Sequence, residues 1–384
     1  MPRNRVIYQS EALYIAPTGL TDASNASETS LRRIQSCNYN FSVDRQDINQ
    51  YGELNGIDRL IINEPTVTSD ISYYFEPIGF NESHMGFRVD ASTGTDSEAK
   101  HMLDHIIRDP DGTGVKNLFI VTADPGVDAN DTGKMAIPTN YDGIIGLGNA
   151  TVTSWSLEAS VGSIPTVSCS FEAQNILFTG GIAAPIIRNP ALKDGSPVTA
   201  SSQVTLPSGA GEFNSDNEVS AVRPGDITFA MIPDAGTTDT DEDTPALGLD
   251  ESDLKIQSVS VSMQISREPI RKLGKLFAFA REISFPITCS MSVNALVGDL
   301  NSKSLHTLLA NCGDNKKYTC YLKLTGQLGS SCVAKHSYIS LKGAKLDSQN
   351  ITSSIGPNKS VSLELSAQIG KNSGLHFTNS SATP

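Results

Sequence analysis

The chain repeats a pattern of residues in the same order at two constant spacings. Residues 34–59 recur 222 positions later, and residues 161–174 recur 194 positions later. A spacing of about two hundred residues is far longer than a solenoid repeat of about 20–50 residues. The sequence therefore predicts two tandem copies of one domain. The shared residues are Ile34-Gln35-Ser36, Arg45, Ile48, Gly52, Leu54 and Arg59, matched by Ile256-Gln257-Ser258, Arg267, Ile270, Gly274, Leu276 and Arg281, and later Val161-Gly162, Val167-Ser168 and Ala173-Gln174, matched by Ile355-Gly356, Val361-Ser362 and Ala367-Gln368.

The length and the local composition suggest where the two domains begin and end. A chain of 384 residues exceeds what one hydrophobic core usually supports. Residues 180–223 are rich in Pro, Gly, Ser and Asn, which is typical of a linker or an extended crossing arm. No hydrophobic periodicity follows Lys371. We therefore expect a first domain at 1–179, a linker at 180–223, a second domain at 224–370 and a flexible C-terminal tail at 371–384.

Alternation of polar and apolar residues predicts a mainly β fold. Residues 34–43 and 257–265 each place small polar side chains on one face of a strand and apolar ones on the other. Each copy also contains one short helical pattern, at 98–107 and at 304–310. The small polar residues are Ser36, Asn38, Asn40 and Ser42 in the first strand and Ser258, Ser260, Ser262 and Gln264 in the second.

Charge and composition exclude several kinds of partner. The net charge is −13 and the sequence pI is about 4.9, so the surface repels nucleic acid and anionic membranes. No apolar run is long enough to span a membrane, and no membrane partner is expected. The six cysteines form no C-x-x-C pair, and most should be buried thiols. A disulfide among Cys312, Cys320 and Cys332 remains open.

No pattern indicates catalysis or metal binding. His101 and His105 are four residues apart, but no third ligand has a defined place near them. Gly143 to Gly148 precede a strand pattern, whereas a phosphate loop needs the amides of a helix N-terminus. The acidic stretch 237–253 lacks the spacing of a calcium loop and is interpreted as a solvated loop. We predict a protein that is not an enzyme and has no cofactor and no metal.

The segments that contain Arg, Gly and Arg are the strongest candidates for a functional surface. They follow the two alternating strands and occur once in each copy. One interpretation is that the arginines only cap strand ends on the surface. Their occurrence in both copies favours contacts with a neighbouring subunit or ring. The predicted interface residues are Arg45, Gly52, Arg59, Arg267, Gly274 and Arg281.

The first ninety residues resemble the major tail tube proteins of long-tailed bacteriophages. The resemblance rests on Leu31 to Asn38-Tyr39, Arg45 to Gly52, Glu64 to Val67, Asp70 to Tyr74 and Asn81 to Phe87. The rest of the chain follows only through the internal repeat. This resemblance implies a small β-sandwich or half-barrel domain with one helix. In that family, stacked rings of six domains surround a channel that conducts DNA.

The resemblance implies a structural virion protein of the tail, assembled in the host cytoplasm. A duplicated domain would make a trimeric ring with pseudo-sixfold symmetry, and the expected partners are a tape-measure protein and a tail terminator. Double-stranded DNA would pass through without specific binding, and the eight small polar residues named above are the candidates for the wall of the channel. The alternatives are another tube-fold component (a baseplate protein, a tube terminator or a contractile secretion tube) or a glycan-binding sandwich module.

Overall fold

The structure is a computed structural model in which most described residues lie in antiparallel strands. Two short α-helices occur in this part of the chain, α1 (Phe80–His84) and α2 (Asp104–Arg108). A 3-10 turn, η4, spans Pro224–Asp226. The structure describes residues 11–18, 29–91, 100–108, 114–123, 129, 141–180, 187–193, 195–198, 206, 222–233, 254–297, 317–328, 333–353, 359–371 and 373–379.

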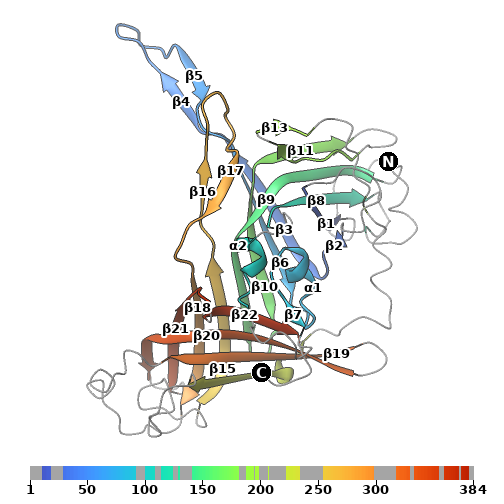
Figure 1. The fold of residues 1–384 in the computed structure, drawn as a ribbon, viewed down its shortest axis with the longest axis vertical. Helices are drawn as coiled ribbons and strands as arrows, with labels where there is room; N and C mark the ends of the chain where they lie inside the picture. The colour runs from blue at the N-terminus through green and yellow to red at the C-terminus, as the bar shows by residue number, and fades with distance from the viewer. Residues whose placement is uncertain are drawn as a thin grey trace.

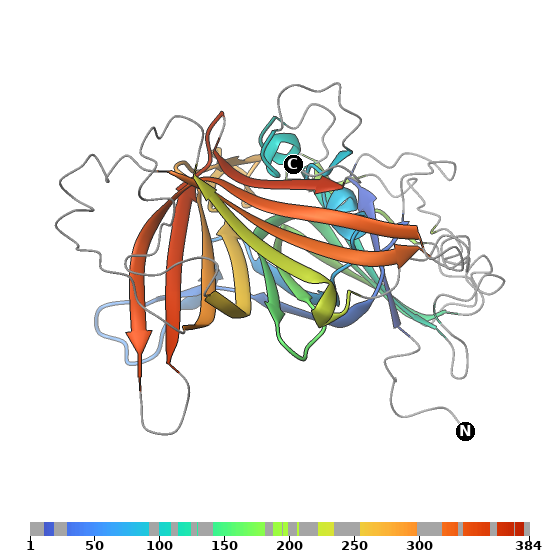
Figure 2. The ribbon, with the colours of Figure 1, turned by 90° about the horizontal axis from the view of Figure 1, so that it is seen from below.

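One antiparallel sheet runs through both halves of the chain, and we call it the central sheet. Its two halves join where β9 pairs with β15, so the strands of the two repeats lie side by side (Figure 2). The strand β3 lies at one edge and the C-terminal part of β20 at the other. In spatial order the strands are β3 (Ile34–Ser42), β6 (Thr66–Tyr74), β10 (Thr166–Ala173), β9 (Tyr141–Ser160), β15 (Leu254–Gln264), β18 (Thr288–Val297), β21 (Ser360–Gln368) and β20 (Val333–Thr352).

Each half adds a second sheet, and the long strands β9 and β20 belong to both layers. The first flanking sheet pairs the N-terminal part of β9 with β8 and β11, and the second pairs the N-terminal part of β20 with β19 and β22. The remaining bounds are β1 (Glu11–Pro17), β2 (Thr29–Ser30), β8 (Lys116–Ala123) and β11 (Asn175–Gly180) in the first flanking sheet, and β7 (Asp90–Ala91), β14 (Ile227–Pro233), β19 (Tyr318–Leu328) and β22 (Gly374–Asn379) in the second.

Two hairpins project from the same end of the central sheet (Figure 1). The first consists of β4 (Arg45–Ile48) and β5 (Asp58–Ile61), and the second of β16 (Arg267–Ile270) and β17 (Ala280–Ile283). These hairpins carry the segments with Arg, Gly and Arg that follow the two alternating strands. A third, shorter hairpin joins β12 (Leu192–Lys193) to β13 (Ser196–Pro197) within the predicted linker.

The geometry repeats with the spacings seen in the sequence. Cys37 of β3 lies opposite Ile71, and Val259 of β15 lies opposite Val293, each 222 residues later. The β-bulges recur as well, after Ile34 in β3 and after Ile256 in β15. A second pair of bulges, after Ser170 and after Leu346, separates equivalent residues of the β9–β10 and β20–β21 pairs. The expectation of a mainly β fold is confirmed, and the strand pairing repeats at the spacing expected for two tandem copies.

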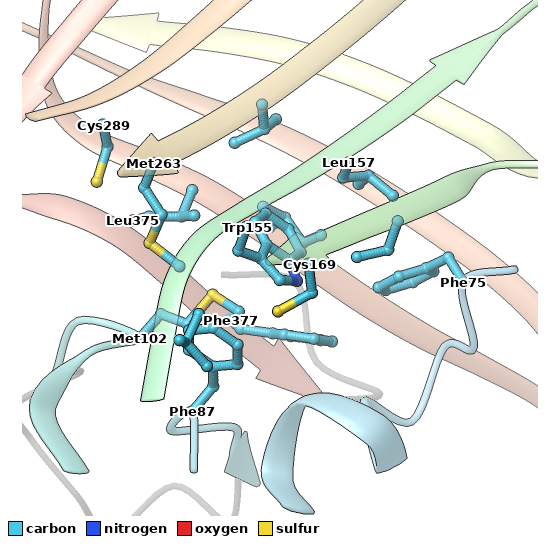
Figure 3. Close-up of a cluster of buried hydrophobic side chains, with 14 of the residues drawn as sticks. Phe75, Phe87, Met102, Trp155, Leu157, Cys169, Met263, Cys289, Leu375 and Phe377 are labelled. Carbon is cyan, nitrogen blue, oxygen red and sulfur yellow. The ribbon is translucent and has the colours of Figure 1, made fainter. Parts of the chain in front are cut away.

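The two halves share one core. Trp155 of the first half is fully buried and meets Phe87 edge to face at 6.4 Å (Figure 3). Phe377 from β22 of the second half stacks on Phe75 of the first at 5.8 Å. The Met102 amide donates a 2.7 Å hydrogen bond to the Leu375 carbonyl. The segment that carries α1, β7 and α2 therefore covers the second flanking sheet.

Two expectations need correction. The C-terminal segment is not a flexible tail over Gly374–Asn379, because β22 pairs with β20 and buries Leu375 and Phe377. The second repeat thus extends to Asn379. Within the described residues, the helix expected at 98–107 is confined to α2, and the described part of the first half contains a second short helix, α1. The helical pattern at 304–310 and the acidic stretch 237–253 lie outside the described residues, as do Cys312 and Cys332, while Cys320 is buried.

Candidate assembly surfaces

The eight predicted channel residues lie on one face of the central sheet, opposite the core. Val259, Val261 and Met263 of β15 are buried, whereas the side chains that alternate with them point away from the core. On this polar face, small side chains hydrogen-bond across strands. Such pairs satisfy the hydroxyls within the sheet and leave few donors for an outside ligand. The cross-strand pairs include Ser36–Ser72 (2.6 Å), Ser262–Ser290 (2.8 Å), Ser258–Asn294 (3.1 Å), Ser170–Asp70 (2.7 Å) and Ser292–Glu364 (2.7 Å).

The charges on the polar face are mainly negative. Lys255 and Lys345 lie where their strands enter the central sheet. Four carboxylates pair across strands with residues of this face, and a surface of this kind repels phosphate. They are Asp70, Glu158, Glu172 and Glu364.

The second hairpin is docked on the first half of the chain. Arg281 is 8% exposed and reaches Glu64 at 3.3 Å and Glu172 at 3.0 Å. Glu64 also accepts a 2.9 Å hydrogen bond from the Ala278 amide. On the other side of this residue, the buried Gln174 amide donates to the Ala278 carbonyl at 3.1 Å. Both backbone polar groups of Ala278 are thus held by side chains of the other half.

Next to this ion pair is a polar recess of about 380 Å³. Arg271 lines it and donates a 3.0 Å hydrogen bond to Asn63. Arg267 donates a 3.3 Å hydrogen bond to the Arg281 carbonyl across the β16–β17 pair. Of the predicted interface arginines, Arg281 therefore lies at the contact between the two halves, and Arg267 bonds within its own hairpin.

The first hairpin has no such contact in the described structure. Arg45 is exposed, and Arg59 pairs at 2.8 Å with Asp47 of its own hairpin, with side chains 68% and 59% exposed. Tyr51 and Leu54 at the tip are fully exposed. A two-stranded ribbon with apolar residues in water is marginal on its own. The first hairpin is therefore a candidate for contacts outside the chain.

The turns of both hairpins require glycine. Gly52 and Gly274 adopt φ angles of 90° and 81°, which side chains with a Cβ rarely adopt. Nothing lies within 4 Å of a Cβ added at either position. These two residues therefore shape the turns. Their role as contact residues stays a prediction.

The two edges of the central sheet expose apolar side chains that sequence reasoning missed. Tyr39 and Phe41 on β3 are 41% and 54% exposed, and Ile351 on β20 is 38% exposed. All three belong to the face that is buried elsewhere in the sheet. An open strand edge with apolar residues is a liability in a monomer. Alternation identified these strands, but it carries no information on which strand ends the sheet.

A buried acid lies beside the contact between the halves. Glu82 of α1 is fully buried and accepts a 2.8 Å hydrogen bond from the Tyr73 hydroxyl. Burial raises the pKa of Glu82 to about 7 and raises the pKa of Tyr73 well above its ordinary value. Glu82 therefore exchanges a proton near neutral pH.

Metal-binding clusters and membrane-spanning helices are absent from the described residues. Among the described residues, no group of three or more His, Cys, Asp or Glu side chains is placed to hold a metal ion. No helix in the described part of the chain is both long and apolar enough to cross a bilayer.

Comparison with known proteins gives weak similarities. No protein-family model matches the chain, and no curated protein matches its sequence. A chain of the anti-feeding prophage baseplate aligns with a TM-score of 0.28 and 8% identity, over 46% of this chain and 97% of that one. An Hcp protein aligns with a TM-score of 0.22 and 9% identity, over 40% and 98%. Both scores lie far below 0.5, so neither similarity identifies the function.

Proposed function

We propose that this chain is a structural component of a tube, in which chains close into rings through the edges of the central sheet and the rings stack. The observation that carries the proposal is the sheet itself. It consists of two equivalent four-stranded modules, with a small, polar, acidic face and two open edges. The proposed setting is the tail tube of a long-tailed phage, with a tape-measure protein and a tail terminator as partners.

The size of the sheet supports three chains per ring. Three copies of the eight-stranded sheet give 24 strands. With strands about 4.8 Å apart and tilted by about 40°, the backbone diameter is about 48 Å. Side chains that extend about 5 Å inward leave about 38 Å, which is wide enough for a DNA duplex. An eight-stranded barrel from a single chain would be filled by its own side chains.

The polar face would then line the channel. Small hydroxyls already paired to each other, together with carboxylates, offer DNA no cation for its phosphates. Apolar side chains in a water-filled channel would be costly, which favours the polar face over the other. The same architecture would serve in a baseplate or a secretion tube.

Native mass spectrometry and negative-stain electron microscopy of the purified chain test the ring. We expect trimers that appear as rings with six similar lobes and that stack at high concentration. Rings of six chains would overturn the stoichiometry. A chain that stays monomeric at every concentration and salt would refute the proposed function.

Replacing Ser260 and Ser262 by Lys tests the channel wall. Both positions lie on the polar face, so rings should form, while DNA passage in assembled particles should slow at low salt and recover at high salt. The matched control replaces the same serines by Asn. Normal passage of DNA through the lysine variant at low salt would exclude this face from the channel. Failed assembly would instead assign it to an interface between chains.

A further inference from the structure

We infer that the junction between the two halves of one chain is the template for the junction between neighbouring chains, so that β20 of one chain pairs with β3 of the next in a defined register. The inference rests on the proposed ring. It specifies the contacts between neighbouring chains of that ring, so the partner is a second copy of this chain. The halves repeat strand by strand, with β3 equivalent to β15 and the C-terminal part of β20 equivalent to that of β9.

The internal junction fixes the register. Within the chain, Val261 of β15 lies opposite Leu157 of β9, and Met263 lies opposite Trp155. Subtracting 222 from the β15 numbers and adding 194 to the β9 numbers gives the equivalent residues at the open edges. The pairs are Tyr39–Ile351, Asn40–Asn350 and Phe41–Gln349, antiparallel across the two chains.

Exposure agrees with this register. Val261, Leu157, Met263 and Trp155 are almost completely buried at the internal junction. Their equivalents Tyr39, Ile351 and Phe41 are among the exposed apolar side chains of the molecule. Pairing the two edges places Tyr39 beside Ile351 and buries both on the core side of the sheet. Asn40 and Asn350 then continue the polar face without interruption.

The two hairpins independently indicate the same pairing of neighbouring chains. Gln174 is buried because the β16–β17 hairpin covers it and accepts its hydrogen bond at the Ala278 carbonyl. Gln368, its equivalent 194 residues later, is exposed. The equivalent of Ala278, 222 residues earlier, is Gly56 in the loop of the first hairpin. The β4–β5 hairpin of one chain therefore covers Gln368 of its neighbour, and Gln368 donates to the Gly56 carbonyl.

The junction within the chain and the junction between chains differ in charge, and this difference determines the order of the halves around the ring. Glu64 and Glu172, which hold Arg281, have Pro286 and Ser366 as their equivalents in the second half. The second hairpin placed there would bury Arg281 without a carboxylate, at a high desolvation cost. The first hairpin carries no such penalty, because Arg59 already pairs with Asp47. First and second halves therefore alternate around the ring.

Cysteine crosslinking tests the register in a Cys37→Ser background, which removes the thiol nearest the edge. The in-register variant is Tyr39→Cys with Ile351→Cys, and the control is Tyr39→Cys with Gln349→Cys, which is two residues out of register on the same face. A disulfide needs Cβ atoms about 3.5–4.5 Å apart, whereas diagonal neighbours are about 7–8 Å apart. The pair Asn40→Cys with Asn350→Cys covers the alternative hydrogen-bonding phase.

We expect oxidation to shift the in-register variants from monomer to dimer and closed trimer on non-reducing gels, with the control remaining monomeric. Rings that form but crosslink only in the control would overturn the register and leave the proposed function intact. A chain that forms no oligomer would refute the ring and the junction together.

A matched pair of glutamine variants tests the hairpin contact. Gln174→Ala should lower the stability of the isolated chain and Gln368→Ala should not, because only the first side chain is buried there. Gln368→Ala should instead weaken trimer formation, seen as a higher protein concentration at half assembly. Trimer formation unchanged by Gln368→Ala would refute the docking of the first hairpin.

Discussion

Arg281 and Arg59 occupy equivalent positions in the two repeats, and the structure predicts losses of stability of very different size when each is replaced by Ala. Arg281 is 8% exposed and lies between Glu64, itself 6% exposed, and the half-exposed Glu172. Arg59 and its partner Asp47 are both largely in water. The comparison isolates burial, because the residue type and the hairpin position are the same.

The expected changes in the free energy of unfolding follow from the environments of the two arginines. Removing one partner of a buried ion pair costs about 3–5 kcal/mol, because the other charge remains buried. Glu64 keeps the Ala278 amide at 2.9 Å and has Arg271 at 4.0 Å, which reduces the loss. We therefore expect Arg281→Ala to lower the free energy of unfolding by about 3 kcal/mol. Arg59→Ala should change it by about 0–1 kcal/mol, as is usual for exposed pairs.

The assay is urea unfolding of both variants at protein concentrations low enough to keep the chains apart. Arg281→Lys serves as a control, since it retains the charge but loses the two-pronged contact, and it should fall between Ala and the unchanged chain. Equal losses for Arg281→Ala and Arg59→Ala would refute the reasoning. A loss below about 1 kcal/mol for Arg281→Ala would show that the pair behaves as a solvated one.

Two further outcomes are expected. Burial raises the pKa of Glu82 from 4.5 to about 7 in the folded chain, so the stability that Glu82 contributes is fully present below pH about 4.5 and is lost as pH rises through 7, by about 3 kcal/mol at most. Glu82→Gln should remove this loss, and parallel pH profiles of unfolding for the two chains would contradict it. A Cβ at Gly79 would lie 2.7 Å from the Phe377 ring, so Gly79→Ala should destabilise the chain in thermal unfolding by about 1–3 kcal/mol, more than Gly52→Ala, which has open space around it.

The internal repeat made most of the central sheet predictable. Identical residues at constant spacing, such as Gly52 and Gly274, marked equivalent hairpins, and alternation assigned Ser260 and its neighbours to the polar face. These features are local, so the sequence carries them. The sequence pattern did not predict strand β22. Its residues Phe377-Thr378 match Phe178-Thr179 at a spacing of 199, because an insertion before them breaks the spacing of 194.

The long-range contacts could not be predicted from the sequence for a different reason. Both Arg59 and Arg281 are equally visible in the sequence, but their environments depend on Glu64 and Glu172, which have no acidic equivalents in the second half. Burial of Arg281 is a property of how the halves meet. No periodicity within one repeat reports that arrangement, and the edge positions of β3 and β20 were hidden for the same reason.

The position of β22 in the chain has a consequence for the order in which the molecule is made. Phe75 and Met102 belong to the first half, yet Phe377 stacks on Phe75 and the Leu375 carbonyl accepts the hydrogen bond of the Met102 amide. A chain that emerges from the ribosome N-terminus first cannot complete this core until β22 has been translated. Unfinished or truncated chains would keep an apolar surface open and remain substrates for chaperones and proteases. Only full-length chains would then enter a growing assembly.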